Sequence, residues 1–207
     1  MSDTYIIGTG GHGKVVLDIL EKSNTNIAGF LDDDEATHDT MINGYPVIGY
    51  INKLEDIKAD AIVAISHNPT RKKLFNKLID FNVNLINAIH PAATVNSFVE
   101  IGSGNMIAAG AVINSNTVIE DNVVINTGAT VDYDCHIEDH VHISPGVSLG
   151  GNVTVKTGAN IGIGASVLPG ITIGENVTVG AGAVVINNLE PNAVYAGVPA
   201  EKVRDIN

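Results

Sequence analysis

Tryptophan is absent from this chain of 207 residues, and aromatic residues make up only 4% of it. A core built on large rings is therefore excluded, whereas 44% of hydrophobic residues suffices for a thin aliphatic core. Long apolar runs are also missing. No stretch approaches the length of a membrane-spanning helix, and the short run Tyr5–Gly8 follows no basic region that would mark a signal peptide. We expect a cytoplasmic protein that inserts in no membrane.

Basic residues are few, with 11 lysines and arginines against 23 aspartates and glutamates and a formal net charge of −12. Nucleic acids and anionic membranes are bound by clustered cations, so the composition argues against a general surface for either. The one cysteine, Cys135, has no partner for an internal disulfide. It falls on an inward column of the repeat described next, and we expect a small buried residue rather than a nucleophile.

A period of six governs the second half of the chain. Every sixth residue from Ile89 to Val185 is isoleucine, valine or leucine, which fits neither the period of a helix nor that of a flat strand. The residue four positions after each of these anchors is usually small or β-branched and forms a second inward column. The pattern is typical of a hexapeptide solenoid with about three hexapeptides per coil. We predict an all-β parallel β-helix of hexapeptide repeats over residues 89–207.

Residues 1–88 instead alternate between strand and helix patterns and predict a small α/β, Rossmann-like domain that binds a mononucleotide. Strands are expected at 4–8, 27–31, 61–65 and 85–88, and helices at 11–22 and 70–80. The glycine loop Gly8–Gly13 between the first strand and the first helix offers backbone N–H groups to a phosphate. The run Asp32–Asp34 follows the second strand, where carboxylates can accept hydrogen bonds from a ribose or base. A second βαβ half, which NAD would need, is missing before the solenoid.

Several features together resemble one family across nearly the whole chain. They are Gly10-Gly11-His12-Gly13, Asp32-Asp33-Asp34, His90-Pro91, the uninterrupted hexapeptide domain and the closing Ala196-Gly197-Val198-Pro199-Ala200. The chain is similar to bacterial hexapeptide-repeat acetyltransferases that act on nucleotide-linked 4-amino-6-deoxy sugars, a family that includes sialic-acid O-acetyltransferases. The resemblance implies a left-handed β-helix, a homotrimer with three active sites between neighbouring subunits and acetyl-CoA as the donor. We expect no metal.

The resemblance also implies a set of site residues. The nucleotide-sugar contacts would fall on Gly10, Gly11, His12, Asp32, Asp33 and Ser66. The acetyl-CoA end of the site would lie beside His142, with the pantetheine arm along Ile163 and Ala181. Apart from the resemblance, the scarcity of cations in this acidic chain makes Lys156, Lys202 and Arg204 candidate partners for the CoA phosphates, although each could equally be a solubilising surface charge.

The implied catalytic segment runs from Asn126 to Cys135 and departs from the family at one position. The family usually carries a histidine base where this chain has Tyr133, followed by an acidic residue that corresponds to Asp134. Tyrosine ordinarily keeps its proton up to a pKa of about 10 and is a poor base at neutral pH. Three explanations remain open. His136 takes over as the base, Tyr133 only orients the acceptor while the amine loses its proton to water or another group, or the chain is slow or inactive.

The histidine cluster His136, His140 and His142 raises one further alternative. None of the three falls on an inward column, so we expect them to face outward or into an intersubunit groove, with His140 exposed to solvent. Histidine is a favoured zinc ligand, which suggests a trimeric β-helix zinc enzyme of the carbonic-anhydrase type. That alternative is disfavoured because its ligands would have to converge from separate coils, and because it leaves residues 1–88 without a role.

The leading hypothesis is an acetyl-CoA-dependent N-acetyltransferase that acts on the 4-amino group of a UDP- or dTDP-linked 4-amino-4,6-dideoxy sugar by direct transfer. Two alternatives are kept. One is a sialic-acid O-acetyltransferase, which the loss of the usual histidine disfavours because a hydroxyl needs a stronger base than an amine. The other is a catalytically impaired protein that binds nucleotide sugars without CoA turnover.

Overall fold

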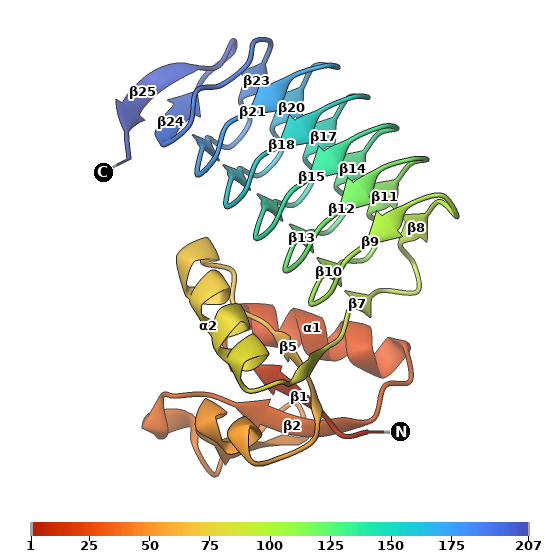
Figure 1. Cartoon of the computed structure of the whole chain (residues 1–207), viewed down its shortest axis with the longest axis vertical. Helices are drawn as coiled ribbons and strands as arrows, with labels where there is room; N and C mark the ends of the chain where they lie inside the picture. The colour runs from red at the N-terminus through yellow and green to blue at the C-terminus, as the bar shows by residue number, and fades with distance from the viewer. Residues whose placement is uncertain (1, 207) are drawn as a thin grey trace.

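The computed structural model describes residues 2–206, and Figure 1 shows a small α/β part stacked below one end of a long solenoid. The α/β part holds a six-stranded sheet in the order β3-β4-β2-β1-β5-β6. Strands β1, β2, β4, β5 and β6 pair in parallel, and β3 pairs antiparallel with β4. The strands are β1 (Thr4–Ile7), β2 (Ile27–Leu31), β3 (Met41–Ile42), β4 (Tyr45–Gly49), β5 (Asp60–Val63) and β6 (Asn84–Leu85).

Two helices connect these strands, α1 (Gly11–Lys22) after β1 and α2 (Asn68–Asp80) after β5, and short 3₁₀ turns cover Glu35–Thr37 and Ile51–Glu55. From the central strand β1 the chain continues to β2, toward one edge of the sheet. From β5, the neighbour of β1 on its other side, it continues to β6, toward the opposite edge. In such sheets the crevice outside the carboxyl ends of the strands, where the strand order reverses, is the usual ligand site. The loops after β1 and β5 therefore meet at the expected place for a ligand.

The predicted helices and parallel strands are confirmed, although β1 ends one residue and β5 two residues earlier than expected, and three larger differences appear. Helix α2 begins at Asn68 rather than residue 70, because Pro69 occupies its first turn. The strand expected at 85–88 is divided, since Leu85 pairs with β5 while Ala88 opens the solenoid. The β3–β4 hairpin was not predicted. Its turn is Asn43-Gly44, with both residues at positive φ, a pair that favours the tight hairpin turn.

The solenoid is a parallel β-helix in which every anchor is the second residue of a two-residue strand. Strands one coil apart, 18 residues on, pair in parallel and build three faces. The first face contains β7 (Ala88–Ile89), β10 (Met106–Ile107), β13 (Val124–Ile125), β16 (His142–Ile143), β19 (Asn160–Ile161) and β22 (Thr178–Val179), and is extended by β24 (Ala193–Ala196) and β25 (Glu201–Asp205). The second contains β8 (Thr94–Val95), β11 (Val112–Ile113), β14 (Thr130–Val131), β17 (Ser148–Leu149), β20 (Ser166–Val167) and β23 (Val184–Val185). The third contains β9 (Glu100–Ile101), β12 (Val118–Ile119), β15 (His136–Ile137), β18 (Thr154–Val155) and β21 (Thr172–Ile173).

Three rows of turns form the corners of this prism. We call the turns from first to second face the first corner (126–129 in one coil), those from second to third face the second corner (132–135), and those from third to first face the third corner (138–141). The two inward columns form one continuous aliphatic core, and Cys135 is 1% exposed within it, as predicted. Burial of that thiol raises its pKa, which leaves it a poor nucleophile.

The α/β part is packed firmly against the solenoid. Helix α1 lies between the sheet and the first face, and its Val16 and Leu20 share one buried cluster with Met106 and Val124. Helix α2 lies beside the third corner (Figure 1), where Asn68 Nδ2 donates to the carbonyl of Gly158 at 3.0 Å. The loops that precede both helices are therefore held close to the first face of the solenoid.

Candidate active site

The glycine loop after β1 is shaped by two close approaches. Gly8 has a φ of +110°, and a Cβ on Gly13 would lie 2.2 Å from the Gly8 carbonyl oxygen, so both positions require glycine. Gly10 and Gly11 differ, because a Cβ on either would meet nothing within 4 Å. Gly10 caps α1 without a side-chain hydrogen bond. The loop thus presents the positive end of a helix to open space, as an anion-binding loop does.

Asp32 ties the end of β2 to this loop. Its Oδ2 accepts hydrogen bonds from the Thr9 backbone N–H at 2.9 Å and the Thr9 hydroxyl at 2.8 Å. Burial acts to raise the pKa of Asp32, but these bonds and those from the backbone of Asp33 and Asp34 outweigh it and lower the pKa. Asp32 is therefore an ionised carboxylate that holds the loop in shape. Whether it also contacts a ligand stays a prediction.

Asp33 lies on a cavity of about 320 Å³ between the sheet edge and α2. Its Oδ1 accepts the Ile51 N–H at 3.1 Å, and its Oδ2 lies 3.8 Å from Lys77 Nζ. Lys73, one turn earlier on α2, also lines the cavity together with Gly8 and Asp32. A carboxylate and two ammonium groups around one apolar-walled cavity suit the polar edge of a base and the phosphates that follow it.

Four of the predicted residues meet where the α/β loops touch the first face. His12 at the start of α1 and His142 on β16 have ring centroids 6.2 Å apart. His142 Nδ1 lies 3.2 Å from the Ser66 carbonyl oxygen, in the loop after β5, and His142 Nε2 lies 3.4 Å from Asn126 Nδ2 at the first corner. Residues far apart in sequence are thus brought together at one point. The predicted substrate loops and the predicted donor groove adjoin there.

The hydrogen bonds fix the tautomer of His142. The Ser66 carbonyl can only accept, so Nδ1 of His142 carries the proton and donates it. In the neutral ring Nε2 then holds a lone pair, which faces the amide nitrogen of Asn126. The orientation of that amide is set by its own oxygen, which accepts the Thr127 N–H at 2.8 Å. Nε2 of His142 is therefore an acceptor beside the first corner.

Both histidines at this junction are neutral at pH 7. The pKa of His142 is lowered to about 4, mainly by burial and further by the charge of Arg71. Burial, His142 and Arg71 together lower the pKa of His12 to about 4 as well. A group that resists protonation this strongly is a weak general base. These rings can orient a substrate by hydrogen bonds, and we assign neither of them as the proton acceptor.

The buried neutral histidines predict an acid-sensitive stability. An unfolded histidine takes up its proton near pH 6.5, whereas these do so only near pH 4, so between those values the unfolded state binds more protons and stability falls as the pH falls. From pH 7 to pH 5 each ring should remove about 2 kcal/mol. Urea unfolding of the natural chain and of His142→Gln at both pH values checks this. Equal losses in the two proteins would contradict it.

Ile163 and Ala181 lie on the first corner in register with Thr127, one coil of 18 residues apart. Ile163 is 62% exposed, and Ala181 is exposed between two glycines. The first corner therefore forms an open ridge, with Ile163 and Ala181 each set between two glycines, that leads away from Asn126 and His142. Its geometry suits a thin extended arm lying close to backbone, and the roles of Ile163 and Ala181 stay predictions.

Tyr133 lies on the second corner, one face away from Asn126 and His142. It is 51% exposed, and its ring lies over Gly151 of the next coil, where a Cβ would be 2.6 Å from the ring atoms. Asp134 beside it has a φ of +55° and accepts a hydrogen bond from Asn116 Nδ2 at 3.1 Å. The residues one coil before and after Asp134, Asn116 and Asn152, also have positive φ. The repeat therefore needs this turn conformation whatever the role of Asp134 in chemistry.

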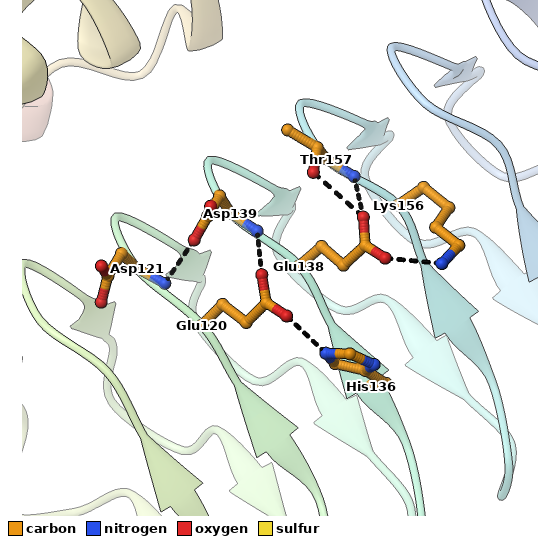
Figure 2. A network of polar contacts seen from close by, with 7 residues as sticks. All are labelled: Glu120, Asp121, His136, Glu138, Asp139, Lys156 and Thr157. Carbon is orange, nitrogen blue, oxygen red and sulfur yellow. Dashed lines mark hydrogen bonds and ion pairs between the residues drawn. The ribbon is translucent and has the colours of Figure 1, made fainter.

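His136 starts β15 on the third face and turns toward the third corner. Figure 2 shows its ring beside Glu120, with Nε2 2.6 Å from Glu120 Oε1. The same network continues through the N–H of Asp139, which donates to Glu120, and through Glu138, which pairs with Lys156 at 2.6 Å. His136 is thus directed away from Tyr133 within one chain, and its role as a base stays a hypothesis.

The expectation that His140 is exposed is wrong. It is 7% exposed, because α2 covers the third corner, and its ring meets Phe75 edge-on at a centroid distance of 5.6 Å. Its Nδ1 lies 2.8 Å from Asn122 Nδ2, and its φ of +61° makes it a corner residue of the repeat. His142 is likewise covered by the α/β part instead of facing outward. A pattern of solenoid positions cannot reveal which corner a second domain will cover.

Two of the three candidate phosphate partners are already paired. Lys156 pairs with Glu138, and Lys202 Nζ lies 2.5 Å from Asp205 Oδ1, while Arg204 is exposed on β25.

Histidines 136, 140 and 142 lie on the third face, the third corner and the first face, so they do not converge. Over residues 2–206 the side chains of histidine, cysteine, aspartate and glutamate form no group of three able to hold a metal ion. No helix of the described part is long and apolar enough to cross a membrane.

Two protein-family models match separate parts of the chain. Residues 3–78 match the PglD N-terminal domain, and residues 116–151 match the bacterial transferase hexapeptide model of six repeats. A curated relative, the UDP-N-acetylbacillosamine N-acetyltransferase of Bacillus subtilis (strain 168), is 37% identical over 115 residues, which are 53% of this chain and 52% of that protein. The chain thus spans about half the length of this curated relative in the matched region.

Solved structures extend the likeness to nearly the whole chain. A mutant of perosamine N-acetyltransferase from Caulobacter crescentus, in complex with CoA and GDP-perosamine, is 39% identical with a TM-score of 0.93, over 99% of this chain and 98% of that one. The acetyltransferase domain of PglB from Neisseria gonorrhoeae FA1090, in complex with acetyl coenzyme A, is 36% identical with a TM-score of 0.92, over 98% of this chain and 99% of that one.

Proposed function

Because this chain belongs to the PglD family of hexapeptide-repeat sugar N-acetyltransferases, we propose that it transfers the acetyl group of acetyl-CoA to the 4-amino group of a nucleotide-linked 4-amino-4,6-dideoxy sugar. UDP or dTDP was expected from the sequence. The names of the relatives include a UDP sugar and a GDP sugar, so GDP joins the candidates. We assign residues 1–88 to nucleotide-sugar binding and residues 89–207 to acetyl transfer.

One observation carries this proposal. The loops at Gly10–His12 and Ser66 adjoin Asn126 and His142 at the head of the first corner, where the ridge toward Ile163 and Ala181 begins. A nucleotide in the cavity beside Asp33 can place its diphosphate at the amino end of α1 and its sugar at this junction. A CoA arm along the first corner brings its thioester to the same place. The two substrates thus approach from different domains.

The reaction needs no covalent enzyme intermediate. The sugar amine attacks the thioester carbonyl, a C–N bond forms, the C–S bond breaks, and CoA leaves as the thiolate or thiol. One proton must leave the nitrogen, and the oxyanion formed in between is stabilised by hydrogen-bond donors such as backbone N–H groups. An amine attacks readily once it is neutral, so acetyl transfer can proceed slowly without a side-chain base. We therefore favour an amine acceptor over a hydroxyl for this chain.

We further propose a homotrimer whose sites lie between subunits. Tyr133, at the position of the family base, is on the second corner, whereas Asn126 and His142 lie at the first. A neighbouring copy would bring its second corner against this first corner, which completes a site that one chain leaves open. Exposed apolar side chains along the second corner, namely Phe98, Leu168 and Ile186, are the surface we expect such a neighbour to cover.

His136→Ala is expected to change turnover by less than about threefold, because Glu120 already binds its Nε2 on the third face. A steady-state CoA-release assay with a thiol reagent measures this. The matched control is Glu120→Gln, which removes the partner charge and keeps His136. Loss of turnover in His136→Ala, with the Glu120 variant also impaired, would instead identify His136 as the relocated base.

The proposed function is tested directly with acetyl-CoA and a panel of acceptors. UDP-, dTDP- and GDP-linked 4-amino sugars and free sialic acid are offered, and CoA release is followed while the acetylated product is identified by mass. We expect turnover with an amino sugar only. Turnover with sialic acid would support O-acetylation. Nucleotide-sugar binding without CoA release, in the natural chain and in every variant, would support a binding protein that has lost catalysis.

A further inference from the structure

Arg71 is a buried cation that joins the two parts of the molecule. Its side chain is 1% exposed, and it lies on α2 where that helix meets the third corner. From the solenoid it contacts the carbonyl oxygens of Asn122 at 3.2 Å and of His140 at 2.7 Å. From the α/β part it contacts the carbonyl oxygen of Ser66 at 3.3 Å and Oδ1 of Asn68 at 2.8 Å.

No carboxylate in the described residues forms a salt bridge with this guanidinium. Its donors all point at neutral oxygens, with further contacts to the carbonyls of Ile65 and Val141 at 3.3 Å. Burying an unpaired charge is costly, and burial lowers the pKa of Arg71 to about 10. Because the side chain is inaccessible and its donors are occupied, it cannot contact a ligand. Its effect must pass through the groups that it holds.

One of those groups leads directly to the candidate site. The Ser66 carbonyl oxygen accepts from Arg71 Nη1 and also from Nδ1 of His142 at 3.2 Å. A continuous line of hydrogen bonds therefore runs from Arg71 through Ser66 and His142 to Asn126. The Ser66 carbonyl oxygen can only accept, and it uses both of its lone pairs here, so the place where Arg71 holds it decides which nitrogen of His142 donates and which faces Asn126.

We propose that Arg71 is a positioning residue of the acetyl-transfer site, which holds the Ser66 carbonyl where it fixes the Nδ1–H tautomer of His142 and aims the Nε2 lone pair at Asn126. The guanidinium fork donates from three separate nitrogens to oxygens on both domains at once, whereas an ammonium has only three donors on a single nitrogen. Displacing the Ser66 loop by about 1 Å is enough to cost roughly 100-fold in rate when two substrates must be aligned. The expected effect of Arg71 on turnover rests on the function proposed above, whereas its expected effect on the tautomer of His142 does not.

The tautomer is measured by long-range ¹H–¹⁵N NMR of the histidine rings in the full-length protein. The His142 signals are identified by their loss in His142→Gln. In the natural chain we expect a protonated Nδ1 and an unprotonated Nε2. In Arg71→Lys and Arg71→Met we expect a mixture of tautomers. Asn87→Ala is the matched control, because Asn87 also ties the two parts together, through Gly102 and Asn105, but lies outside the line to His142.

Kinetics supply the second readout. Arg71→Lys should lower kcat at least tenfold while the Kd for the nucleotide diphosphate changes less than twofold, because Arg71 forms no hydrogen bond with Asp33, Lys73 or Lys77 of the cavity and reaches its lining only at the Ile65 carbonyl. Asn87→Ala should leave kcat within threefold. If the natural chain is too slow, the comparison is made in Tyr133→His. If neither the natural chain nor Tyr133→His shows turnover, the proposed function is rejected. The NMR result then decides alone whether Arg71 sets the tautomer of His142.

Three outcomes overturn the role of Arg71. One is an Nε2–H tautomer of His142 in the natural chain. Another is a variant that alters the tautomer without altering kcat, or kcat without the tautomer. The third is an Asn87→Ala protein that loses as much kcat as Arg71→Lys, which would show that Arg71 acts only by holding the domains together. If Arg71→Met does not fold, Arg71→Lys alone carries both comparisons.

Discussion

Tyr133→His is expected to raise the turnover of acetyl transfer by about 10²–10⁴-fold, the usual contribution of a positioned general base. Tyrosine at neutral pH holds its proton, whereas an imidazole titrates close to the working pH. The second corner can accept the smaller ring, because Tyr133 is half exposed and lies over Gly151 without being enclosed. The gain should appear in kcat more than in KM.

Tyr133→Phe is the matched control for this prediction. If the phenol only orients the acceptor, its removal should lower turnover by no more than about tenfold, the scale of one lost hydrogen bond. If Tyr133 is the base after all, Tyr133→Phe should abolish turnover and Tyr133→His should bring little gain. A pH profile of kcat completes the comparison. In Tyr133→His we expect turnover to rise through the pKa of the introduced imidazole, a step absent from the natural chain.

His142, at the junction of the two domains, cannot substitute for the histidine base that the family carries at the position of Tyr133. Nε2 of His142 is unprotonated but faces the Asn126 amide, and burial and the charge of Arg71 oppose its protonation. His136 has a carboxylate partner suited to a catalytic dyad, yet that partner draws it toward the third corner. The natural chain therefore has a built site and no obvious proton acceptor within one subunit. This combination is why the Tyr133 substitution is expected to have such a large effect.

The solenoid could be predicted from sequence because its information is local and repeated. Each anchor needs only to be aliphatic at a fixed spacing, and the structure places all of them as second residues of strands. The backbone conformation of the corner residues can also be predicted from the repeat. Asn116, Asp134 and Asn152 follow one another at 18 residues, all with positive φ, and asparagine and aspartate tolerate that conformation best among residues with a side chain.

The candidate site was harder to predict because it depends on how two domains dock. Sequence placed Ser66, Asn126 and His142 on separate elements, and only the docking of α1 and α2 brings them together. Arg71 was missed for the same reason, since an arginine in an amphipathic helix is indistinguishable from a solvated surface charge until its carbonyl partners are known. The one available signal was a basic residue on the otherwise apolar side of α2, with Phe75 and Leu78.

A mixing experiment tests whether sites lie between subunits. The first partner is the double variant Tyr133→His/Ala181→Trp, in which an indole blocks the first corner while the introduced histidine remains on the second. The second partner is the natural chain, which has an open first corner and no histidine base. Each is expected to be slow alone. Ala181 is exposed on a turn, so its substitution should not disturb the core.

Mixed trimers should regain activity if one subunit supplies the second corner and its neighbour the first. After denaturation and refolding of an equal mixture, about one quarter of the sites, one half times one half, combine the introduced histidine with an open first corner. Turnover should therefore approach about a quarter of that of Tyr133→His alone. The two proteins refolded separately and then combined are the control. A mixture no faster than that control would place both corners of each site on one chain, which the separation of Tyr133 from Asn126 and His142 on different corners argues against.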